Sequence, residues 1–521
     1  MKRDTSRDGF INTIQSTALK RFRPLWSFLQ SVPFLERLVN RLIINNAMSK
    51  AVNRPHAFST LSNYTSWRSL MDKTYFGRRA PATEIPNLPD AQDVAALFRI
   101  PESGPTLSPK STMLFPVFAQ WFTDGFLLTD DEDRRRTRTS HQIDLNQIYG
   151  YTEHHTTLVR LHDPHRKGRL KSVESTEGEF APRLFDEDGN LKPEFEGLPL
   201  PSRLSDDTPL EQKRTIFAFA GERSNSTPFT AAMTTLFLRE HNRIADNIAA
   251  QEPSWDDDRV FEVSRNTMIA MLIKVVIEEY INHIAPYHFR LRAFPQFVWE
   301  AKWNRPNWIP VEFNLLYRWH SLVPSEVTVA QQQYPSATLL LNNQLLIEHG
   351  VQEMLAAASA NRAWRLGLAN TAKFLLPVEL ATILQGRETQ VASYNTYRTA
   401  MSYPTVTDFN QITGDETRIN ALKAVYSSVD QIEFYVGLMA EDAPVESAVP
   451  PMIGRMVALD AFSHALTNPL LSVNVFNERT FSALGWKTIN ETFSLADIVK
   501  RNTSSSQSAP ITMDWPKGST H

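Results

Sequence analysis

Apolar residues recur every three to four positions along much of this chain, which is the spacing of one face of an α-helix. The pattern predicts helices over residues 227–250, 260–284, 342–358 and 377–384. Proline at position 228 favours a helix start there, because the first turn of a helix needs no amide donor. Extended runs are few, and the sequence shows no internal repeat. The sequence therefore predicts an all-α fold with few short strands.

Residues 1–60 form a basic segment with ten Lys and Arg and three acidic residues. Arg37 and Arg41 are expected on the side opposite its apolar residues. A basic amphipathic helix can lie in a membrane interface and can form an entrance for an apolar substrate. The alternative is a helix that docks on the body of the protein. The apolar residues at helical spacing are Phe34, Leu35, Leu38, Val39, Leu42 and Ile43.

The rest of the chain is expected to form one domain over residues 61–502. Charge blocks over 130–138 and polar stretches over 204–209 and 441–451 are typical of surface connections rather than of domain boundaries. The serine-rich run after residue 502 predicts a flexible tail over 503–521.

Composition excludes several classes of function. The chain has 521 residues, a formal net charge of −3 and no cysteine, so disulfides, thiolate metal sites and cysteine nucleophiles are excluded. The charge gives no reason to expect nucleic acid as a partner. The polar start carries no secretory signal, and no apolar run is long enough to span a bilayer. These features favour a cytoplasmic protein, in part peripheral on a membrane.

The candidate chemistry lies in residues 312–324, Glu-Phe-Asn-Leu-Leu-Tyr-Arg-Trp-His-Ser-Leu-Val-Pro. The segment is predicted to be helical, which places Tyr317 and His320 on one face, roughly 4.5 Å apart along the axis. A histidine there can bind a metal while the tyrosine lies beside the same cofactor. On its own, such a pair is more often ordinary packing.

This stretch resembles the proximal-haem helix of the cyclooxygenase and fatty-acid dioxygenase branch of the animal haem peroxidase superfamily. Other blocks resemble that branch in the same order, from about residue 64 to about residue 502. The resemblance implies a predominantly helical haem peroxidase fold that binds haem b. The blocks are residues 118–124, 141–150, 236–243, 394–398 and 429–435.

The resemblance also implies roles for residues on both sides of a haem. His320 would be the proximal iron ligand, with Trp319 beside the cofactor. On the distal side Gln120 is kept, but Asp124 stands where the branch has a histidine. An aspartate, with an ordinary pKa of about 3.9, is a poorer base at neutral pH than a histidine at about 6.5, so weak peroxidase activity is expected unless burial raises that pKa. Arg223 aligns with a distal arginine and would either activate peroxide or form a structural salt bridge.

Tyr317 matches the tyrosine that these enzymes convert to a radical. The resemblance implies that this radical takes hydrogen from a fatty acid and that O2 then adds to give a lipid hydroperoxide. Lys50 and Arg54 are candidate cations for the fatty-acid carboxylate. The residues implied to line the substrate channel are Phe313, Leu316, Tyr280, Ile281, Ser463 and Tyr287.

Covalent attachment of haem is not expected. The glutamate and methionine that bond haem in related peroxidases fall at Ser226 and Thr227, which offer neither group. Two other functions stay open: a haem peroxidase or specialised oxidase acting on another small molecule, and a haem- or lipid-binding relative that has lost catalysis. Association as a homodimer is also left open.

Overall fold

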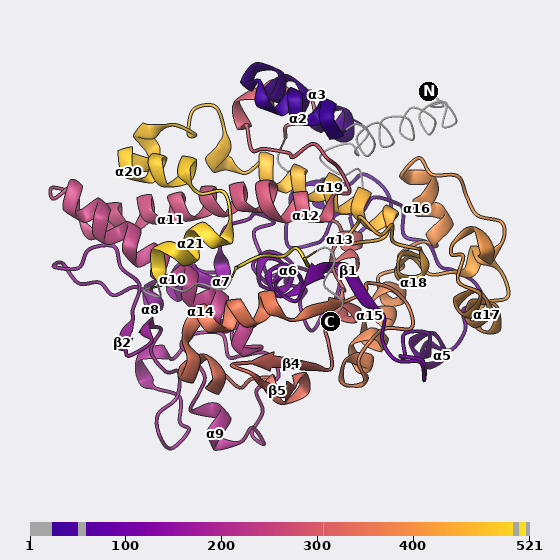
Figure 1. The fold of residues 1–521 in the computed structure, drawn as a ribbon, viewed down its shortest axis with the longest axis horizontal. Helices are drawn as coiled ribbons and strands as arrows, with labels where there is room; N and C mark the ends of the chain where they lie inside the picture. The colour runs from indigo at the N-terminus through magenta and orange to yellow at the C-terminus, as the bar shows by residue number, and fades with distance from the viewer. Residues whose placement is uncertain (1–22, 50–58, 306, 504–509, 517–521) are drawn as a thin grey trace.

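The computed structural model describes residues 23–49, 59–305, 307–503 and 510–516, and helices dominate it (Figure 1). The predicted all-α fold with few short strands is confirmed. The α-helices are α2 (Arg23–Ser31), α3 (Pro33–Ser49), α4 (Trp67–Met71), α5 (Ala91–Ala96), α6 (Leu114–Asp124), α7 (Asn146–Tyr149), α8 (Glu153–Val159), α9 (Leu210–Lys213), α10 (Pro228–Gln251), α11 (Asp257–Val275), α12 (Asn282–Ile284), α13 (Val311–Leu316), α14 (Gln344–Ala360), α15 (Leu376–Glu388), α16 (Tyr394–Ala400), α17 (Glu416–Val425), α18 (Phe434–Ala440), α19 (Pro451–Leu466), α20 (Glu478–Glu491) and α21 (Leu495–Asn502).

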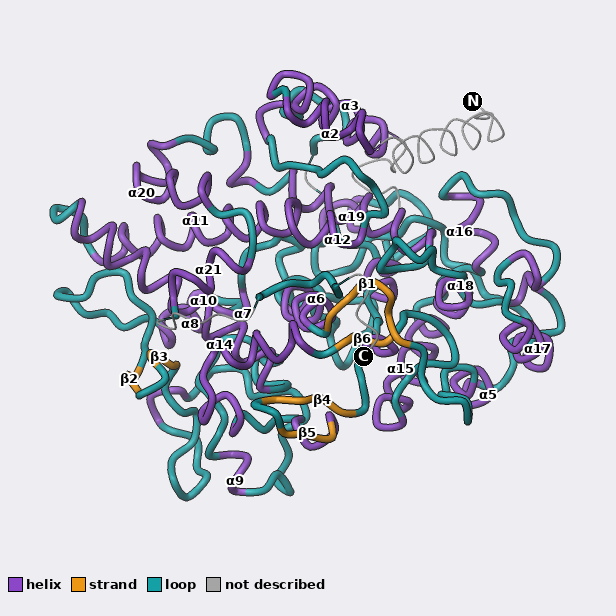
Figure 2. Tube along the Cα trace, viewed as in Figure 1, coloured by secondary structure: helices purple, strands orange, loops and turns teal. Residues whose placement is uncertain are grey.

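Within the described residues, the strands form small two-stranded antiparallel ladders, which appear as short orange segments in Figure 2. These ladders are short, so the core is formed by helices, and the described residues contain no central sheet. The pairs are β1 (Leu107–Thr112) with β6 (Arg362–Trp364), β2 (Val173–Ser175) with β3 (Gly178–Phe180), and β4 (Glu326–Val329) with β5 (Gln332–Pro335).

The predicted helix over 260–284 is present but not uniform. Helix α11 ends at Val275 and continues as a π-helix, η2 (Val276–Ile281), before α12. A π-turn adds a residue to the helical turn and changes the direction of the side chains beyond it, and such turns are frequent at functional sites. Here the π-turn carries Tyr280, which lies next to Tyr317.

The polar residues of the 236–243 block hold the buried helix α10 to its neighbours. Glu240 is fully buried and accepts hydrogen bonds from Arg243 and Arg501. His241 hydrogen bonds through one ring nitrogen to the Tyr149 hydroxyl and through the other to the carbonyl of Gly168. A buried polar group without a partner destabilises the fold. The hydrogen bonds of Glu240 and His241 therefore give these two residues a structural role in the core.

Other sequence blocks meet around α13. The buried carboxylate of Glu312 accepts hydrogen bonds from the Arg79 amide, at 3.0 Å, and from the Tyr397 hydroxyl, at 2.7 Å. Before the helix, Nδ1 of His141 accepts from the Ile309 amide at 3.0 Å. These contacts join segments far apart in the chain and fix where α13 begins.

Helix α3 is docked on the body of the protein through one side. Ile44 and Met48 are buried, and Asn40 is buried as well. The side-chain oxygen of Asn40 accepts a hydrogen bond from the Arg292 amide at 2.9 Å. The docked-helix alternative therefore describes the inner side of α3.

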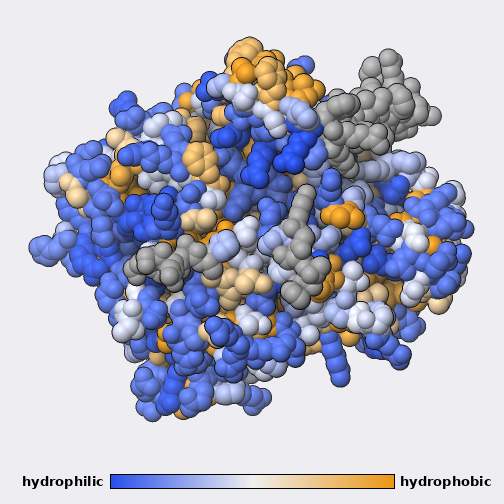
Figure 3. All heavy atoms as spheres, in the orientation of Figure 1, coloured by the Kyte–Doolittle hydropathy of each residue, from blue (hydrophilic) through white to orange (hydrophobic). Residues whose placement is uncertain are grey.

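The outer face of α2 and α3 is apolar and basic together. Phe28, Phe34 and Leu42 have exposed fractions of 60%, 73% and 59%. In Figure 3 this face is an orange patch at the top of the molecule. Arg37 and Arg41 are also exposed, and the Arg37 guanidinium lies over the rings of Phe294 and Phe297. Among the described residues, no helix has the length and apolar character needed to cross a bilayer.

Residues 510–516, inside the predicted flexible tail, run along β1. The Thr112 amide donates to the carbonyl of Met513 at 2.9 Å. Asp514 accepts from the ring of His283 at 2.8 Å. Met513 is buried. The structure differs here from the predicted flexible tail, because Met513 and Asp514 form contacts with residues that are distant in the sequence.

Candidate active site

Tyr317 and His320 do not share a helix. Helix α13 ends at Leu316; Tyr317 has φ −95° and ψ 17°, Trp319 has φ −100° and ψ 41°, and a single 3-10 turn, η4 (His320–Leu322), follows. The Trp319 indole donates to the carbonyl of Leu316 at 2.7 Å and satisfies an acceptor that the helix end leaves free. The predicted continuous helix is therefore wrong. Tyr317 caps the end of α13, whereas His320 begins a separate 3-10 turn.

Tyr317 lies in an aromatic cluster. Its ring stacks on Trp319, with centroids 4.7 Å apart, and meets Phe313 edge-on at 4.9 Å. Burial raises the pKa of Tyr317, and the neighbouring Tyr280 hydroxyl acts in the opposite direction. The Tyr317 hydroxyl has no well-aligned hydrogen-bond partner among the described residues. The phenol is thus neutral, and its hydroxyl is shielded from water.

His320 is distinguished from other buried histidines by its free ring nitrogen. His141, His241 and His283 each use both ring nitrogens in hydrogen bonds. In the described part of the chain, Nε2 of His320 makes no hydrogen bond, and Nδ1 lies 3.3 Å from a carboxylate oxygen of Glu379. The His320 side chain is 19% exposed. Its geometry leaves Nε2 available for a metal.

Gln120 and Asp124 lie one turn apart on α6. The other side chains from Leu114 to Thr123 are buried, whereas Gln120 is exposed, so this face of α6 is not covered by the core. Asp124 accepts a hydrogen bond from Arg223 at 3.3 Å through Oδ1. Its Oδ2 is buried and has no hydrogen-bond partner among the described residues. An unpaired buried oxygen of this kind is suited to bind a ligand proton.

Burial raises the pKa of Asp124 to about 6, although the nearby Arg223 guanidinium lowers it. Both effects were expected from the sequence, and burial is the larger. Carboxylates of Asp124 and Glu222 outweigh the effect of burial on Arg223 and raise the pKa of its guanidinium, which stays charged. A base with a pKa near 6 next to a fixed cation is suited to proton transfer near neutral pH.

These residues fit a haem. The ring of Phe115 on α6 lies 5.5 Å from that of Trp319, so the distal helix and the His320 segment are neighbours. The Arg318 guanidinium is close enough to Asp124 to lower its pKa. A free imidazole nitrogen on one element could bind haem iron, and an amide and a carboxyl group on the other would supply the polar groups of the distal pocket.

The predicted channel residues next to Tyr317 are buried. Ser463 accepts a hydrogen bond from Asn307 at 2.7 Å, and the Phe313 ring stacks on that of His464 at 5.9 Å. Phe313 and Tyr280 contact Tyr317 directly. The predicted channel residues that the structure buries are Phe313, Leu316, Tyr280, Ile281 and Ser463.

Tyr287 is half-buried and lies near a cation that sequence reasoning missed. Burial raises the pKa of Tyr287, and the Arg455 guanidinium lowers it. Arg455 donates through Nε to the carbonyl of Met401 at 3.1 Å. No carboxylate of the described residues lies within ion-pair distance of Arg455. The sequence candidates for this cation, Lys50 and Arg54, lie outside the described residues.

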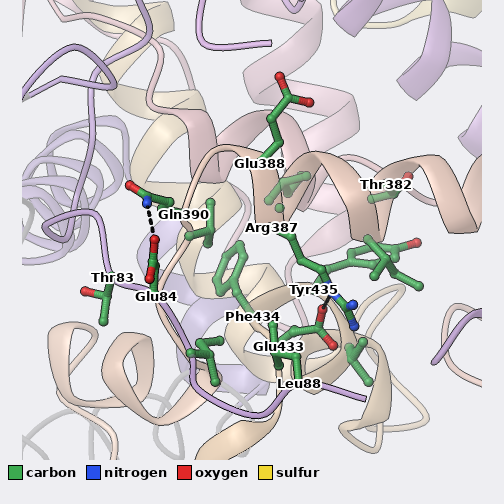
Figure 4. Close-up of a pocket in the computed structure, with 16 residues that line it drawn as sticks. Thr83, Glu84, Leu88, Thr382, Arg387, Glu388, Gln390, Glu433, Phe434 and Tyr435 are labelled. Atoms are coloured by element: carbon green, nitrogen blue, oxygen red, sulfur yellow. Dashed lines mark hydrogen bonds and ion pairs between the residues drawn. The ribbon is translucent and has the colours of Figure 1, made fainter. Parts of the chain in front are cut away.

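A pocket of about 330 Å³ lies between α15, α18 and the loop around Glu84 (Figure 4). Arg387 and Glu433 form an ion pair of 2.7 Å in its wall, and Tyr435 reaches its edge. Neither Tyr317 nor His320 is among the residues that line it. The pocket therefore borders the surroundings of His320 without being the site itself.

Glu379 is a further residue that sequence reasoning missed. It is fully buried on α15 and lies next to His320. The sequence feature that could have identified Glu379 is its position as the one charged residue in the stretch over 377–384. An unpaired charge buried there would destabilise the fold, so a partner was to be expected.

Comparison with known proteins supports the same reading. Residues 40–513 match the animal haem peroxidase family. Prostaglandin G/H synthase 2 from Mus musculus is 30% identical over 506 residues, which cover 93% of this chain and 80% of that protein. The enzyme from Oryctolagus cuniculus is 29% identical over 501 residues, with the same coverage.

Solved structures share the fold at low sequence identity. A fatty acid alpha-dioxygenase from Arabidopsis thaliana is 16% identical, with a TM-score of 0.72, and the match covers 100% of this chain and 94% of that one. Peroxidase A from Dictyostelium discoideum is 18% identical, with a TM-score of 0.66, and the match covers 88% of this chain and 99% of that one. The chain belongs to the animal haem peroxidase family and is a haem oxidoreductase.

Proposed function

We propose that this protein is a haem-dependent fatty-acid dioxygenase that works through a tyrosyl radical on Tyr317. The observation that carries the proposal is the surroundings of this phenol. It is neutral, stacked on Trp319, three residues from the free imidazole of His320, and bordered by apolar side chains. Its hydroxyl is buried and lacks a well-aligned partner in the described structure, with the Tyr280 hydroxyl as a close polar neighbour.

The chain positions the radical and the substrate. When bound, haem supplies the oxidising equivalent that removes an electron from the Tyr317 phenol, whose proton leaves with it. The radical then takes a hydrogen atom from an acyl C–H bond, O2 adds to the carbon radical, and the peroxyl group takes a hydrogen atom back from Tyr317. The products are a lipid hydroperoxide and a regenerated tyrosyl radical.

Arg455 is proposed to bind the carboxylate of the fatty acid. A partly buried guanidinium without a carboxylate partner in the described structure favours an anionic ligand. The Tyr287 and Tyr403 phenols lie close enough to Arg455 for its charge to lower their pKa values, and they add hydrogen-bonding groups. Ser463 lies on the same helix, α19, nearer the Tyr317 ring cluster.

An oxygen electrode tests the proposed function. Haem-reconstituted protein is given free fatty acids of different length and unsaturation, their methyl esters, and a trace of peroxide. O2 uptake with free acids, a hydroperoxide in the mass spectrum and weaker uptake with esters are expected. Absence of uptake with every fatty acid contradicts the proposal.

Asp124 favours a second function, which is peroxidase chemistry on another small molecule. With a pKa of about 6, Asp124 can take the proton of a bound peroxide and return it to the departing oxygen, while Arg223 stabilises the developing negative charge. Peroxide turnover without fatty-acid oxygenation would support this function. Haem binding with neither activity would indicate a relative that has lost catalysis.

Peroxide consumption is expected to depend on the ionisation of Asp124. The base is the carboxylate form, so the rate should fall about tenfold per pH unit below pH 6 and level off above it. Asp124→Asn should remove this dependence and lower the rate by roughly 10²- to 10⁴-fold, the range for loss of a general base. Stopped-flow absorbance from pH 4.5 to 8 measures it.

Asp124→His is the matched variant. An imidazole has a similar pKa and is not tied to Arg223 as an ion pair, so peroxidase turnover should rise above that of the original protein. A flat pH profile in the unchanged protein, or no gain in Asp124→His, would contradict the role of Asp124.

The haem is proposed to be held without covalent links. Thr227 caps helix α10 through a reciprocal hydrogen-bond pair with Thr230, so its side chain is already used. Ser226 offers neither a carboxylate nor a thioether. Extraction of intact haem b by acidified butanone would show this directly, and a modified haem left on the protein would contradict it.

The outer face of α2 and α3 is proposed to bind a membrane surface and admit the fatty acid from it. Large exposed apolar residues next to Arg37 and Arg41 are suited to an anionic lipid interface. Phe34→Ser together with Leu42→Ser is expected to lower the fraction bound to phosphatidylserine vesicles by roughly tenfold, because two apolar side chains no longer enter the lipid. Leu210→Ser, on exposed α9, is the control. Equal sedimentation of all three proteins would refute the proposal.

A further inference from the structure

Glu379 is a buried carboxylate, and one of its two oxygens lies beside the His320 segment. One oxygen accepts a hydrogen bond from Thr371 at 2.8 Å, and the other accepts from the Tyr435 hydroxyl at 2.6 Å. The oxygen that faces Tyr435 lies 3.3 Å from Nδ1 of His320. The Tyr435 oxygen is also 2.9 Å from the carbonyl of Arg318, so the group that orients the carboxylate touches the same turn.

The charge of Glu379 has no other partner in the described structure. No arginine or lysine of the described residues lies within ion-pair distance of it. A buried carboxylate without a cation destabilises the fold unless hydrogen bonds or an opposite charge compensate for burial. Two hydroxyl donors compensate in part, and the imidazole of His320 is a further N–H donor within reach.

His320 in turn lacks a well-aligned hydrogen-bond acceptor for its buried Nδ1 among the described residues. Glu379 is the carboxylate within reach, and a small rotation of the imidazole would align an Nδ1 proton with it. In that arrangement the proton is on Nδ1, and the lone pair of Nε2 is left free to bind iron.

We propose that Glu379 is a positioning residue that fixes the tautomer and orientation of His320 and makes its Nε2 a stronger donor to iron. The inference rests on haem ligation by His320, which is part of the proposed function. Histidines that bind metals commonly donate their second ring N–H to a carboxylate or carbonyl, and loss of that acceptor costs roughly 10- to 100-fold in metal affinity or activity. A stronger donor also favours the oxidised iron, which lowers the reduction potential.

The proposal differs from a purely structural role for Glu379. Glutamine has nearly the same size and keeps a carbonyl oxygen for Tyr435 or Thr371, so packing is retained in Glu379→Gln. Its amide carries no charge and presents N–H groups instead of a second acceptor, so it cannot hold an Nδ1 proton in the same way. Signals from the iron–histidine bond therefore separate positioning from packing.

The test uses full-length protein reconstituted with haem b. Haem affinity is measured by absorbance titration, the iron–histidine stretch by resonance Raman spectroscopy of the ferrous protein, and the reduction potential by spectroelectrochemistry. Glu379→Gln is expected to weaken haem binding roughly 10- to 100-fold, to lower the stretching frequency and to raise the potential. Glu379→Asp should recover part of each change.

Glu433→Gln is the matched control. Glu433 is also buried, accepts from a tyrosine hydroxyl (Tyr426, 2.5 Å) and pairs with a cation (Arg387, 2.7 Å), but it faces the pocket of Figure 4 rather than His320. It should leave the three haem signals unchanged. If Glu379→Gln does not fold, Tyr435→Phe replaces it, with smaller shifts in the same direction.

Two results would overturn the inference in distinguishable ways. An unchanged stretch, affinity and potential in Glu379→Gln, with an iron–histidine band that disappears in His320→Gly, leaves haem ligation by His320 intact and rejects the role of Glu379. Absence of a band assignable to His320 in the unchanged protein rejects the proposed ligand and the role of Glu379 together.

Discussion

Tyr317→Phe is expected to reduce fatty-acid-dependent O2 uptake to background while leaving haem binding unchanged. Phenylalanine fills the same space against Phe313 and Trp319, so the aromatic packing is retained. It has no O–H bond to give a radical at an accessible potential. An oxygen electrode, haem titration and electron paramagnetic resonance after addition of peroxide measure the three quantities.

Tyr149→Phe and Tyr280→Phe are the controls for this experiment. Tyr149 is buried and bonded to His241, and its loss should leave oxygenation intact. Tyr280 lies beside Tyr317, so its removal should alter the radical signal without abolishing uptake. Uptake that survives in Tyr317→Phe and disappears in Tyr280→Phe would assign the reactive phenol to Tyr280 and contradict the proposed mechanism.

His320→Gly is expected to weaken haem binding by more than the roughly 100-fold that loss of an outer hydrogen-bond partner costs, because the iron ligand itself is removed. All oxidative activity should be lost with the haem. Imidazole added in millimolar amounts should enter the vacated space and restore part of the binding. Absorbance titration with and without imidazole measures both effects.

His283→Asn is the control for the loss of a buried ring. His283 uses both ring nitrogens, towards Ser111 and Asp514, and has none to offer a metal. Its replacement should leave haem affinity unchanged. Equal haem binding by His320→Gly and the unchanged protein would show that another side chain is the ligand.

The sequence was sufficient for the fold class and for the identity of the central residues. Periodicity located α10, α11, α14 and α15, although the structure buries α10 on every side from Pro228 to Asn242 rather than on one face. Resemblance then singled out Tyr317 and His320, and the structure places them beside a buried aromatic cluster and a free imidazole nitrogen. The sequence also indicated that burial and Arg223 would act against each other on Asp124.

The remaining features depend on contacts that periodicity does not contain. Helix α13 ends where the Trp319 indole donates to the carbonyl of Leu316. This side-chain contact ends the helix although the sequence pattern continues to favour one. Glu379 and Arg455 became candidates only when their neighbours were known. The docked side of α3 could not be predicted, because apolar spacing does not say which side of an amphipathic helix meets the protein.

The pairing of β1 with residues 512–515 has a consequence for how the protein is made. Thr112 and Thr512 are hydrogen bonded although 400 positions separate them. Because ribosomes deliver the chain from its amino end, β1 can contact residues 512–515 only after the 400 positions that separate Thr112 from Thr512 have been synthesised. The surroundings of the strand that leads into α6 are thus completed long after the strand itself, and nascent chains that stop before residue 512 should retain haem less well than chains that include it.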